Sequence, residues 1–443
     1  MRRIDLTASA VRRVTPRGPS NESRRALLLT LTMACSLGML ASTIYVPSIP
    51  AIAHALHASV GCVQLTFVGY LAAFAVSMLV LGPLSDRFGR RRTIIFGVAL
   101  SALGSLACAA SPTIQFLIAA RMLQGIGLSG GMVVGRAIVR DLYDEEGAAQ
   151  IMAGLSIVIT LVQAFAPIPG GYLQAWVGWR ANFVAVALFA AIALVLVIRF
   201  VPRTRSASED RSQSIAVLSS AMLGSYHSLI GARRFLRYAL TATGAHAGFH
   251  IFTAGAPAVL MIGLGVATQD YGYYASLPPV GFLVGSFLSN RLSRRLGVDN
   301  LIAIGSAILI PAGLAMVALA IAHVASPYAI VGPMMVVCCG SGLITPNAVA
   351  GSLSVKAGIV GAASGLASFI QMTGAATATA VLSLGASGNP IMLAVVVASV
   401  GLFAVAAFGS LSRFSRLPRH VGVRRTFFCL WRHLERWGIT CRG

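Results

Sequence analysis

Twelve long apolar runs occupy most of the 443-residue chain. A helix needs about 20 apolar residues to cross the hydrocarbon core of a bilayer. Charged residues make up only 10% of the sequence, too few to form the polar surface of a soluble protein of this size. The sequence therefore predicts an all-α integral membrane protein with twelve transmembrane helices. The runs fall at 26–46, 60–82, 93–111, 113–135, 147–173, 182–200, 236–263, 271–290, 299–321, 328–349, 358–385 and 390–411.

The basic residues alternate between the two sides of the predicted membrane. The net charge is +22, and nearly all 34 basic residues lie in the tails and in every second connection. Arg121 lies inside a predicted span, and Arg180 lies on the opposite side. Because basic connections stay in the cytoplasm, we expect a multi-pass protein of the bacterial inner membrane with both termini cytoplasmic. Nucleic-acid binding is disfavoured, since it needs basic residues on one folded face.

A polar segment divides the runs into two groups of six. It contains several arginines and serines, which favour a flexible connection. Two sets of six spans with a longer connection are typical of repeated helix bundles. We therefore expect a cytoplasmic basic tail at 1–25, an N-terminal six-helix bundle at 26–201, a cytoplasmic linker at 202–235, a C-terminal six-helix bundle at 236–411 and a basic, amphipathic cytoplasmic tail at 412–443.

The connection after the second span, GPLSDRFGRRR, is more than a basic loop. Its aspartate can pair with an arginine or cap a helix, and its glycines permit close helix contact and a tight turn. A similar pattern follows the eighth span, at Gly285–Gly297. We interpret the first segment as a latch that gates the two bundles; the alternative is a connection that only orients the protein in the membrane. The residues assigned to the latch are Gly82, Asp86, Arg87, Gly89, Arg90 and Arg91.

Arg121 is the charged residue that most needs an explanation. A charged side chain in the middle of a bilayer costs about 3 kcal/mol or more unless a cavity or partner solvates it. Gln124 lies one helical turn away on the same face and can donate or accept a hydrogen bond. We interpret both as functional residues; the alternative is that Arg121 extends to the membrane surface.

Several segments resemble the major facilitator superfamily. The connection at Gly82–Arg92 resembles its conserved cytoplasmic motif, and RMLQG at Arg121–Gly125 resembles its R-x-x-Q-G motif. APIPGG at Ala166–Gly171 is similar to the proline–glycine motif associated with antiporters. RAIVRDLY at Arg136–Tyr143 and GLITPN at Gly342–Asn347 resemble the Bcr/CflA-type drug:proton antiporters.

The resemblance implies the major facilitator fold, with the proton gradient as energy source and no cofactor. It also implies that Arg121 acts in proton exchange or in substrate anchoring. The proline–glycine segment is expected to bend its helix, because proline lacks a backbone donor. The family usually has further glycines upstream, where this chain has Val162 and Ala166, so a purely structural bend is the alternative. The residues assigned to the bend are Pro167, Pro169, Gly170 and Gly171.

The first span departs from the related antiporters, which often carry an aspartate where this chain has Thr43, shortly before Tyr45. The interior of the predicted spans contains no Asp or Glu at all. His246 and His250 are four residues apart and share a helical face. Histidine titrates near neutral pH, so either imidazole is a candidate proton carrier. The alternative is that both only hydrogen-bond within a packed bundle.

These features predict a secondary active transporter that exports small organic compounds by alternating access, coupled to protons. One alternative is a facilitator or importer of a sugar or metabolite on the same fold. A more distant one is an intramembrane enzyme or scaffold, but an enzyme would need paired acids, a Ser/His set or a metal cluster. We expect a monomer in the lipid bilayer, with no metal and no enzymatic activity. The candidate pathway residues are Arg121, Gln124, Thr43, Tyr45, His246, His250, Asn347 and Gln371.

Overall fold

A computed structural model describes residues 21–202, 224–355, 359–385 and 388–412 of the chain. All regular secondary structure in these residues is helical. Most of the predicted linker and both predicted tails lie outside the described residues, so the boundaries of these segments stay predictions.

The first six spans form one bundle, and two of them are interrupted. The first span breaks between α1 and α2 around a short 3-10 turn, η1, and the fifth breaks between α6 and α7. The helices are α1 (Asn21–Thr43), η1 (Val46–Ser48), α2 (Ile49–Ala55), α3 (Val60–Phe88), α4 (Arg90–Ala109), α5 (Ile114–Leu142), α6 (Glu145–Phe165), α7 (Pro167–Trp176) and α8 (Trp179–Phe200).

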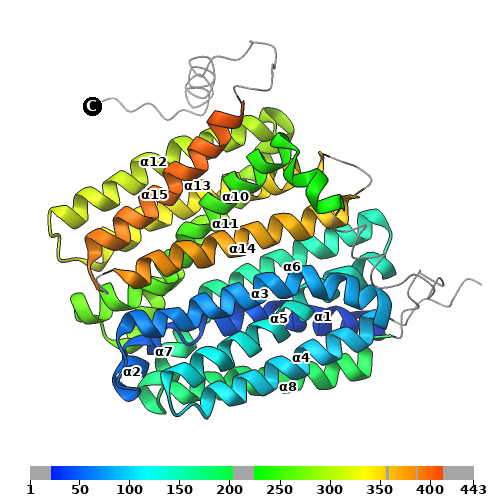
Figure 1. Ribbon diagram of the computed structural model, residues 1–443, viewed down its shortest axis with the longest axis horizontal. Helices are drawn as coiled ribbons and strands as arrows, with labels where there is room; N and C mark the ends of the chain where they lie inside the picture. Colours follow the sequence, from blue (N-terminus) through cyan, green and yellow to red (C-terminus); the bar gives the residue numbers. More distant parts are fainter. Residues whose placement is uncertain (1–20, 203–223, 356–358, 386–387, 413–443) are drawn as a thin grey trace, which may run out of the picture.

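The last six spans form a second bundle, in which the first span ends in a wider π-helical segment, η2. The helices are α10 (Arg233–Pro257), η2 (Ala258–Gly263), α11 (Thr268–Leu296), α12 (Val298–Ile321), α13 (Pro327–Leu353), α14 (Val360–Leu384) and α15 (Pro390–Ser412). Figure 1 shows α10 to α15 above the first bundle.

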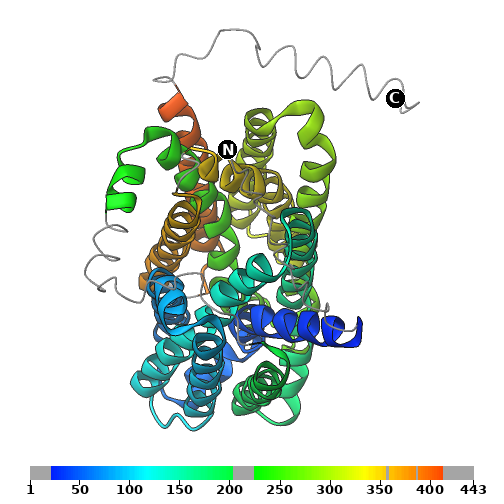
Figure 2. The ribbon, with the colours of Figure 1, turned by 90° about the vertical axis from the view of Figure 1, so that its right-hand side faces the viewer.

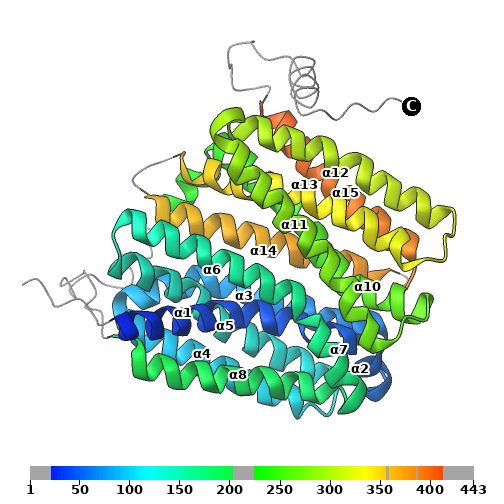
Figure 3. The ribbon, with the colours of Figure 1, turned by 180° about the vertical axis from the view of Figure 1, so that it is seen from behind.

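The two bundles meet along a long boundary. Helix α3 packs against α14, and α6 and α7 pack against α11 (Figures 1 and 3). Figure 2, turned by 90°, shows the same two groups of helices one above the other. We call the end where α1 begins and α3 finishes the terminal end, and the opposite end, which carries α2, α7 and η2, the distal end. In Figure 1 the distal end is on the left.

Eleven helices of the described residues are long and apolar enough to cross a membrane. The twelfth expected span is α11, which has 29 residues, more than a bilayer requires. Its composition is less apolar because it carries Asp270 and Arg291 near its two ends and two prolines, Pro278 and Pro279, inside. The predicted class, twelve helices in two six-helix bundles, is confirmed.

The expected loop at Gly82–Arg92 is almost entirely helical. Helix α3 continues through Gly82 to Phe88, and α4 begins at Arg90. The whole turn is made by Gly89, whose φ of +92° is open to glycine and strained for other residues. Its N–H donates to the carbonyl of Ser85, 3.1 Å away. The prediction of a loop was therefore wrong, while the expected tight turn at Gly89 is confirmed.

Candidate functional site

Arg121 lies in the core of the first bundle with no exposed surface. Its guanidinium carbon is 4.3 Å from the ring centroid of Tyr45 and 4.3 Å from that of Tyr70. Phe183 of α8 contributes a third ring at 5.9 Å. A desolvated cation on an aromatic face is stabilised by about 2 kcal/mol. The aromatic cage of Tyr45, Tyr70 and Phe183 holds the arginine inside the bundle, so the alternative of surface extension was wrong.

Polar contacts fix the orientation of this arginine. Arg121 Nη1 donates to the carbonyl oxygen of Ala41, 3.1 Å away, and to Gln124 Oε1. Gln124, also fully buried, donates through Nε2 to Ser105 Oγ at 2.7 Å. The hydroxyl of Tyr70 donates to the carbonyl oxygen of Gly38 at 2.7 Å. Hydrogen bonds thus connect Arg121 directly to α1 and, through Gln124, to α4. Tyr70 is also hydrogen-bonded to α1.

The two histidines lie against each other at the border of the bundles. The Nε2 atoms of His246 and His250 are 3.1 Å apart, so one donates and the other accepts. His250 is buried, and its ring centroid is 5.9 Å from that of Phe67 on α3 of the other bundle. Phe67 also stacks on Tyr70, at 6.4 Å between centroids. The predicted shared helical face is confirmed, and aromatic rings connect the pair to the Arg121 cage.

The described acidic residues lie at the ends of spans or just outside them. Asp141 is in the last turn of α5, Asp144 follows it, and Asp270 and Asp299 begin α11 and α12. The interiors of the described spans therefore hold a buried arginine and two histidines without a carboxylate, as the sequence predicted.

Three other candidate residues are packed differently from one another. Thr43 is buried and donates to the carbonyl of Met39 in its own helix, at 2.9 Å. Asn347 joins α13 to α11 by donating to Ser289 Oγ at 2.6 Å. Gln371 on α14 is buried, and its Nε2 has no hydrogen-bond partner among the described residues. Of the three, only Gln371 has a free donor to offer a ligand.

Because it joins two spans, Asn347 should matter for stability. Replacing Asn347 by alanine leaves Ser289 without its partner, and a lost buried hydrogen bond costs about 1–3 kcal/mol. We expect the thermal unfolding temperature of the purified N347A variant to fall. A change of Thr345, which lies on the same helix and whose hydroxyl has no partner among the described residues, to alanine serves as the control. An unchanged midpoint in N347A would contradict a structural role for this amide.

The fifth span is interrupted at the proline–glycine segment, and the bend itself stays a prediction. Helix α6 ends at Phe165 and α7 begins at Pro167. Gly170 lies against the backbone at Ile44, and a Cβ atom on Gly171 would be only 2.5 Å from the carbonyl oxygen of Thr268 on α11. The segment therefore brings the two bundles into backbone contact at the distal end.

Further contacts hold the bundles together on the distal side. Gln64 of α3 donates through Nε2 to the carbonyl oxygen of Ala254 on α10, at 3.1 Å. The hydroxyls of Tyr172 and Tyr273 are 3.0 Å apart across α7 and α11. Together with the glycine contact, these interactions form a distal seam, made by Gln64, Gly171, Tyr172, Ala254, Thr268 and Tyr273.

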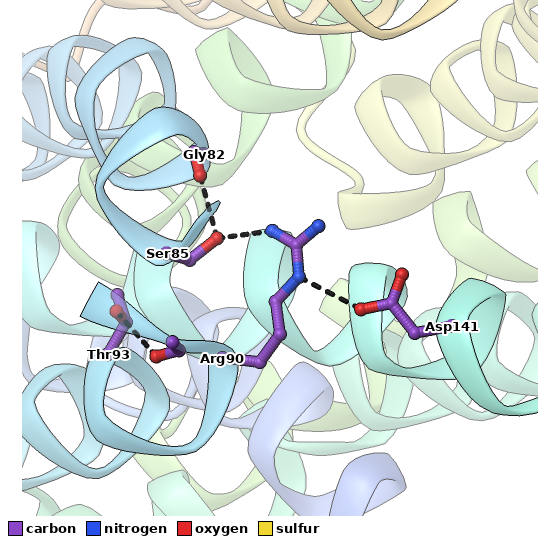
Figure 4. Close-up of polar contacts among 6 residues, drawn as sticks. Gly82, Ser85, Arg90, Thr93 and Asp141 are labelled. Carbon is purple, nitrogen blue, oxygen red and sulfur yellow. Dashed lines mark hydrogen bonds and ion pairs between the residues drawn. The ribbon is translucent and has the colours of Figure 1, made fainter. Parts of the chain in front are cut away.

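At the terminal end, Arg90 connects three helices of the first bundle (Figure 4). Its Nε lies 3.0 Å from Asp141 Oδ2, and its Nη1 donates to Ser85 Oγ at 2.5 Å. Arg91 donates to the carbonyl of Ile198 at the end of α8, at 2.6 Å. The side chain of Asp86, which the sequence suggested as the acidic partner, lies outside the described residues. The acid seen beside Arg90 comes from the end of α5.

Sequence reasoning missed a matching cluster in the second bundle. Arg237 Nη2 lies 3.6 Å from Asp299 Oδ2, and the hydroxyl of Tyr238 donates to Asp299 Oδ1 at 2.8 Å. The ring of Phe408 covers the guanidinium carbon of Arg237 at 4.0 Å. The available signal was an arginine at the start of one span and an aspartate at the start of another, both on the predicted cytoplasmic side.

Comparison with known proteins decides the family. The model of the Major Facilitator Superfamily matches residues 31–379. The chain belongs to the major facilitator superfamily. It is therefore a multi-pass membrane protein that transports small molecules. The sequence resemblance to this family is confirmed.

Curated relatives include several named for resistance. The multidrug resistance protein D of Escherichia coli K12 is 29% identical over 348 residues, 79% of this chain and 86% of the relative. A bicyclomycin resistance protein homologue of Haemophilus influenzae is 29% identical over 65% of this chain and 71% of its own. Among solved structures, a D-xylose–proton symporter superposes with a TM-score of 0.70 at 15% identity, over 86% of this chain and 97% of that chain, which shows the shared fold.

Proposed function

We propose that this superfamily member exports small organic compounds, including antimicrobial compounds, in exchange for protons. The observation that carries the proposal is the placement of a titratable pair, His246 and His250, at the border between the bundles and next to the Arg121 cage. The names of the relatives, which include multidrug and bicyclomycin resistance proteins, support the substrate class.

The histidine pair takes the role that a membrane carboxylate has in many antiporters. A proton added to the pair is shared between the two Nε2 atoms, 3.1 Å apart. It brings a positive charge to a buried site beside Phe67 of the other bundle. A buried charge is costly unless solvated, so protonation favours an arrangement in which the bundles separate here and water reaches the imidazoles. This links proton binding to the rocking of the bundles.

The orientation follows from the charges of the connections. With the terminal end in the cytoplasm, as the basic residues favour, the distal seam closes the periplasmic face. Arg90 and Arg91 then lie at the cytoplasmic face, where they hold α3, α4, α5 and α8 together. The protein works as a monomer in this proposal, since each chain supplies both bundles and the border between them.

The absence of Asp and Glu from the interiors of the predicted spans supports a second candidate function, the import or facilitated diffusion of a metabolite. The direction of transport separates the two functions. An importer would raise the cellular content of its substrate in cells that express the protein, whereas an exporter lowers it.

The test measures the efflux of a fluorescent drug-like dye from cells that express the protein. We expect a protonophore to stop efflux, because the gradient supplies the energy. The double variant H246A/H250A should lose at least tenfold of the initial efflux rate while reaching the membrane in normal amounts. The double variant H54A/H57A, which changes a histidine in the last turn of α2 and another just after that helix, is the matched control. Efflux that survives the protonophore would refute proton coupling, and efflux that survives H246A/H250A would refute the assignment of the proton site.

A further inference from the structure

The guanidinium of Arg121 uses only part of its hydrogen-bonding capacity. Both of its hydrogen bonds, to Ala41 and Gln124, are made by Nη1. Nε and Nη2 are buried and have no hydrogen-bond partner among the described residues. These two nitrogens share one edge of the planar group, on the side away from the donors that are already used.

This free edge has the geometry of a carboxylate-binding site. The N–H groups of Nε and Nη2 point in the same direction, and a carboxylate or similar oxyanion can accept both at once. The ring centroids of Tyr45 and Tyr70 are each 4.3 Å from the guanidinium carbon. A carboxylate that accepts from both N–H groups lies in the plane of the guanidinium, beside these two rings.

The charge around Arg121 also favours an anion. Its side chain is fully buried, and the neighbours that bind it, Ala41 and Gln124, are neutral. In the described spans, the acidic side chains are confined to the helix ends. A buried cation that lacks a charged partner is costly, and a bound anion removes that cost, whereas a cationic ligand adds to it.

We propose that Arg121 is the anchor of an oxyanion subsite, and that the preferred substrates are aromatic or amphiphilic organic acids bound through a carboxylate. This rests on the proposed export function, which it narrows to a substrate class. The aromatic cage supplies flat apolar surfaces for the body of such a compound. Phe67, which stacks on Tyr70, contacts His250 of the second bundle, so the cage borders the place where the two bundles meet.

The test compares ligands that differ only in charge. Purified protein is titrated with benzoate, 2-naphthoate and 9-anthracenecarboxylate at pH 7.5, each beside its carboxamide, which has the same shape but no charge. The readout is the rise in unfolding temperature, which reports binding to the folded state. We expect at least one acid to bind at least tenfold more tightly than its amide. Equal binding of acid and amide in all three pairs would overturn the proposal.

The variant R121K keeps the positive charge but loses the two parallel N–H donors that a carboxylate can accept from at once. We expect the acid-over-amide preference to fall at least fivefold in this variant. Arg180 offers a matched control, because its guanidinium carbon also lies over an aromatic ring, 4.3 Å from the centroid of Trp179, but in the first turn of α8 at the distal end. R180K should keep the preference of the wild type. An acid preference that persists unchanged in R121K would assign it to another site and overturn the proposal.

These results are separate from the test of the export function. If the dye is exported in a proton-dependent manner but the acids show no preference over the amides, the export function stands and the oxyanion subsite is wrong. If the acids bind through Arg121 but expression moves no compound outward, the subsite stands and the direction of transport is wrong.

Discussion

Replacing Gly170 by alanine is expected to leave almost no folded transporter. A Cβ atom at this position of α7 would overlap the carbonyl oxygen of Ile44, which lies in the break between α1 and α2. The carbonyl of Gly170 itself accepts a hydrogen bond at 3.1 Å from Asn182, which also donates to Ser48 at 2.8 Å. Because this amide ties α7 to η1 and α8, the backbone has little freedom to move away from an added methyl group.

The expected loss is larger than for an ordinary core substitution. Overpacking with side chains that can shift costs about 1–3 kcal/mol, and here the obstacle is backbone. We expect G170A to give little protein that elutes as a single species in detergent, and no detectable efflux. Gly154 of α6 is the matched control, because a Cβ atom there has no neighbour within 4 Å. G154A should be as stable as the wild type or slightly more so, since alanine favours a helix by about 1 kcal/mol over glycine. Similar yields for both variants would refute the close contact at Ile44.

Features fixed by one helix or by the bilayer could be predicted from the sequence. The spans follow from the length of apolar chain that a bilayer requires, even for α11, where polar residues weaken the signal. The break before Pro167 follows from the missing backbone donor. The contact of His246 with His250 follows from the helical repeat, which places residues four apart on one face.

Features that join distant segments could not be predicted in the same way. Arg90 binds Asp141, which is 51 residues away, and nothing in the local pattern pointed to that aspartate. The sequence suggested Asn347 as a residue of the transport pathway, because its side chain is polar and lies in a predicted span. In the structure this amide donates to Ser289 on α11 and so joins two helices. The ring of Tyr70 over Arg121 depends on how α3 turns against α5. Such choices depend on the mutual packing of the helices, which a single sequence does not specify.

The substitution Q124E is expected to stabilise the protein and inactivate it. Gln124 Oε1 already accepts a hydrogen bond from Arg121, so glutamate places a carboxylate beside the buried guanidinium with little change in shape. A pair of opposite charges at contact distance is worth about 4 kcal/mol at the effective dielectric of a protein interior. Since Arg121 is already desolvated, only the new carboxylate must lose its water. We expect the unfolding temperature of Q124E to rise.

Transport should respond in the opposite direction. An arginine that is permanently paired has no excess charge to offer a substrate or to exchange during the cycle. We expect the efflux rate of Q124E to fall at least tenfold. The variant Q124L is the comparison: it leaves Arg121 and Ser105 without their partner, which costs about 1–3 kcal/mol. Q124L should therefore lose both transport and stability.

The two variants thus separate the charge of the site from its hydrogen bonds. If the uncompensated charge of Arg121 is what the site needs for transport, then Q124E and Q124L lose activity alike but shift the unfolding temperature in opposite directions. A drop in unfolding temperature for Q124E as large as that for Q124L would mean that the carboxylate finds no free cation to pair with. Arg121 would then already be neutralised in the folded protein, and the charge balance that favours an anionic substrate would fail with it.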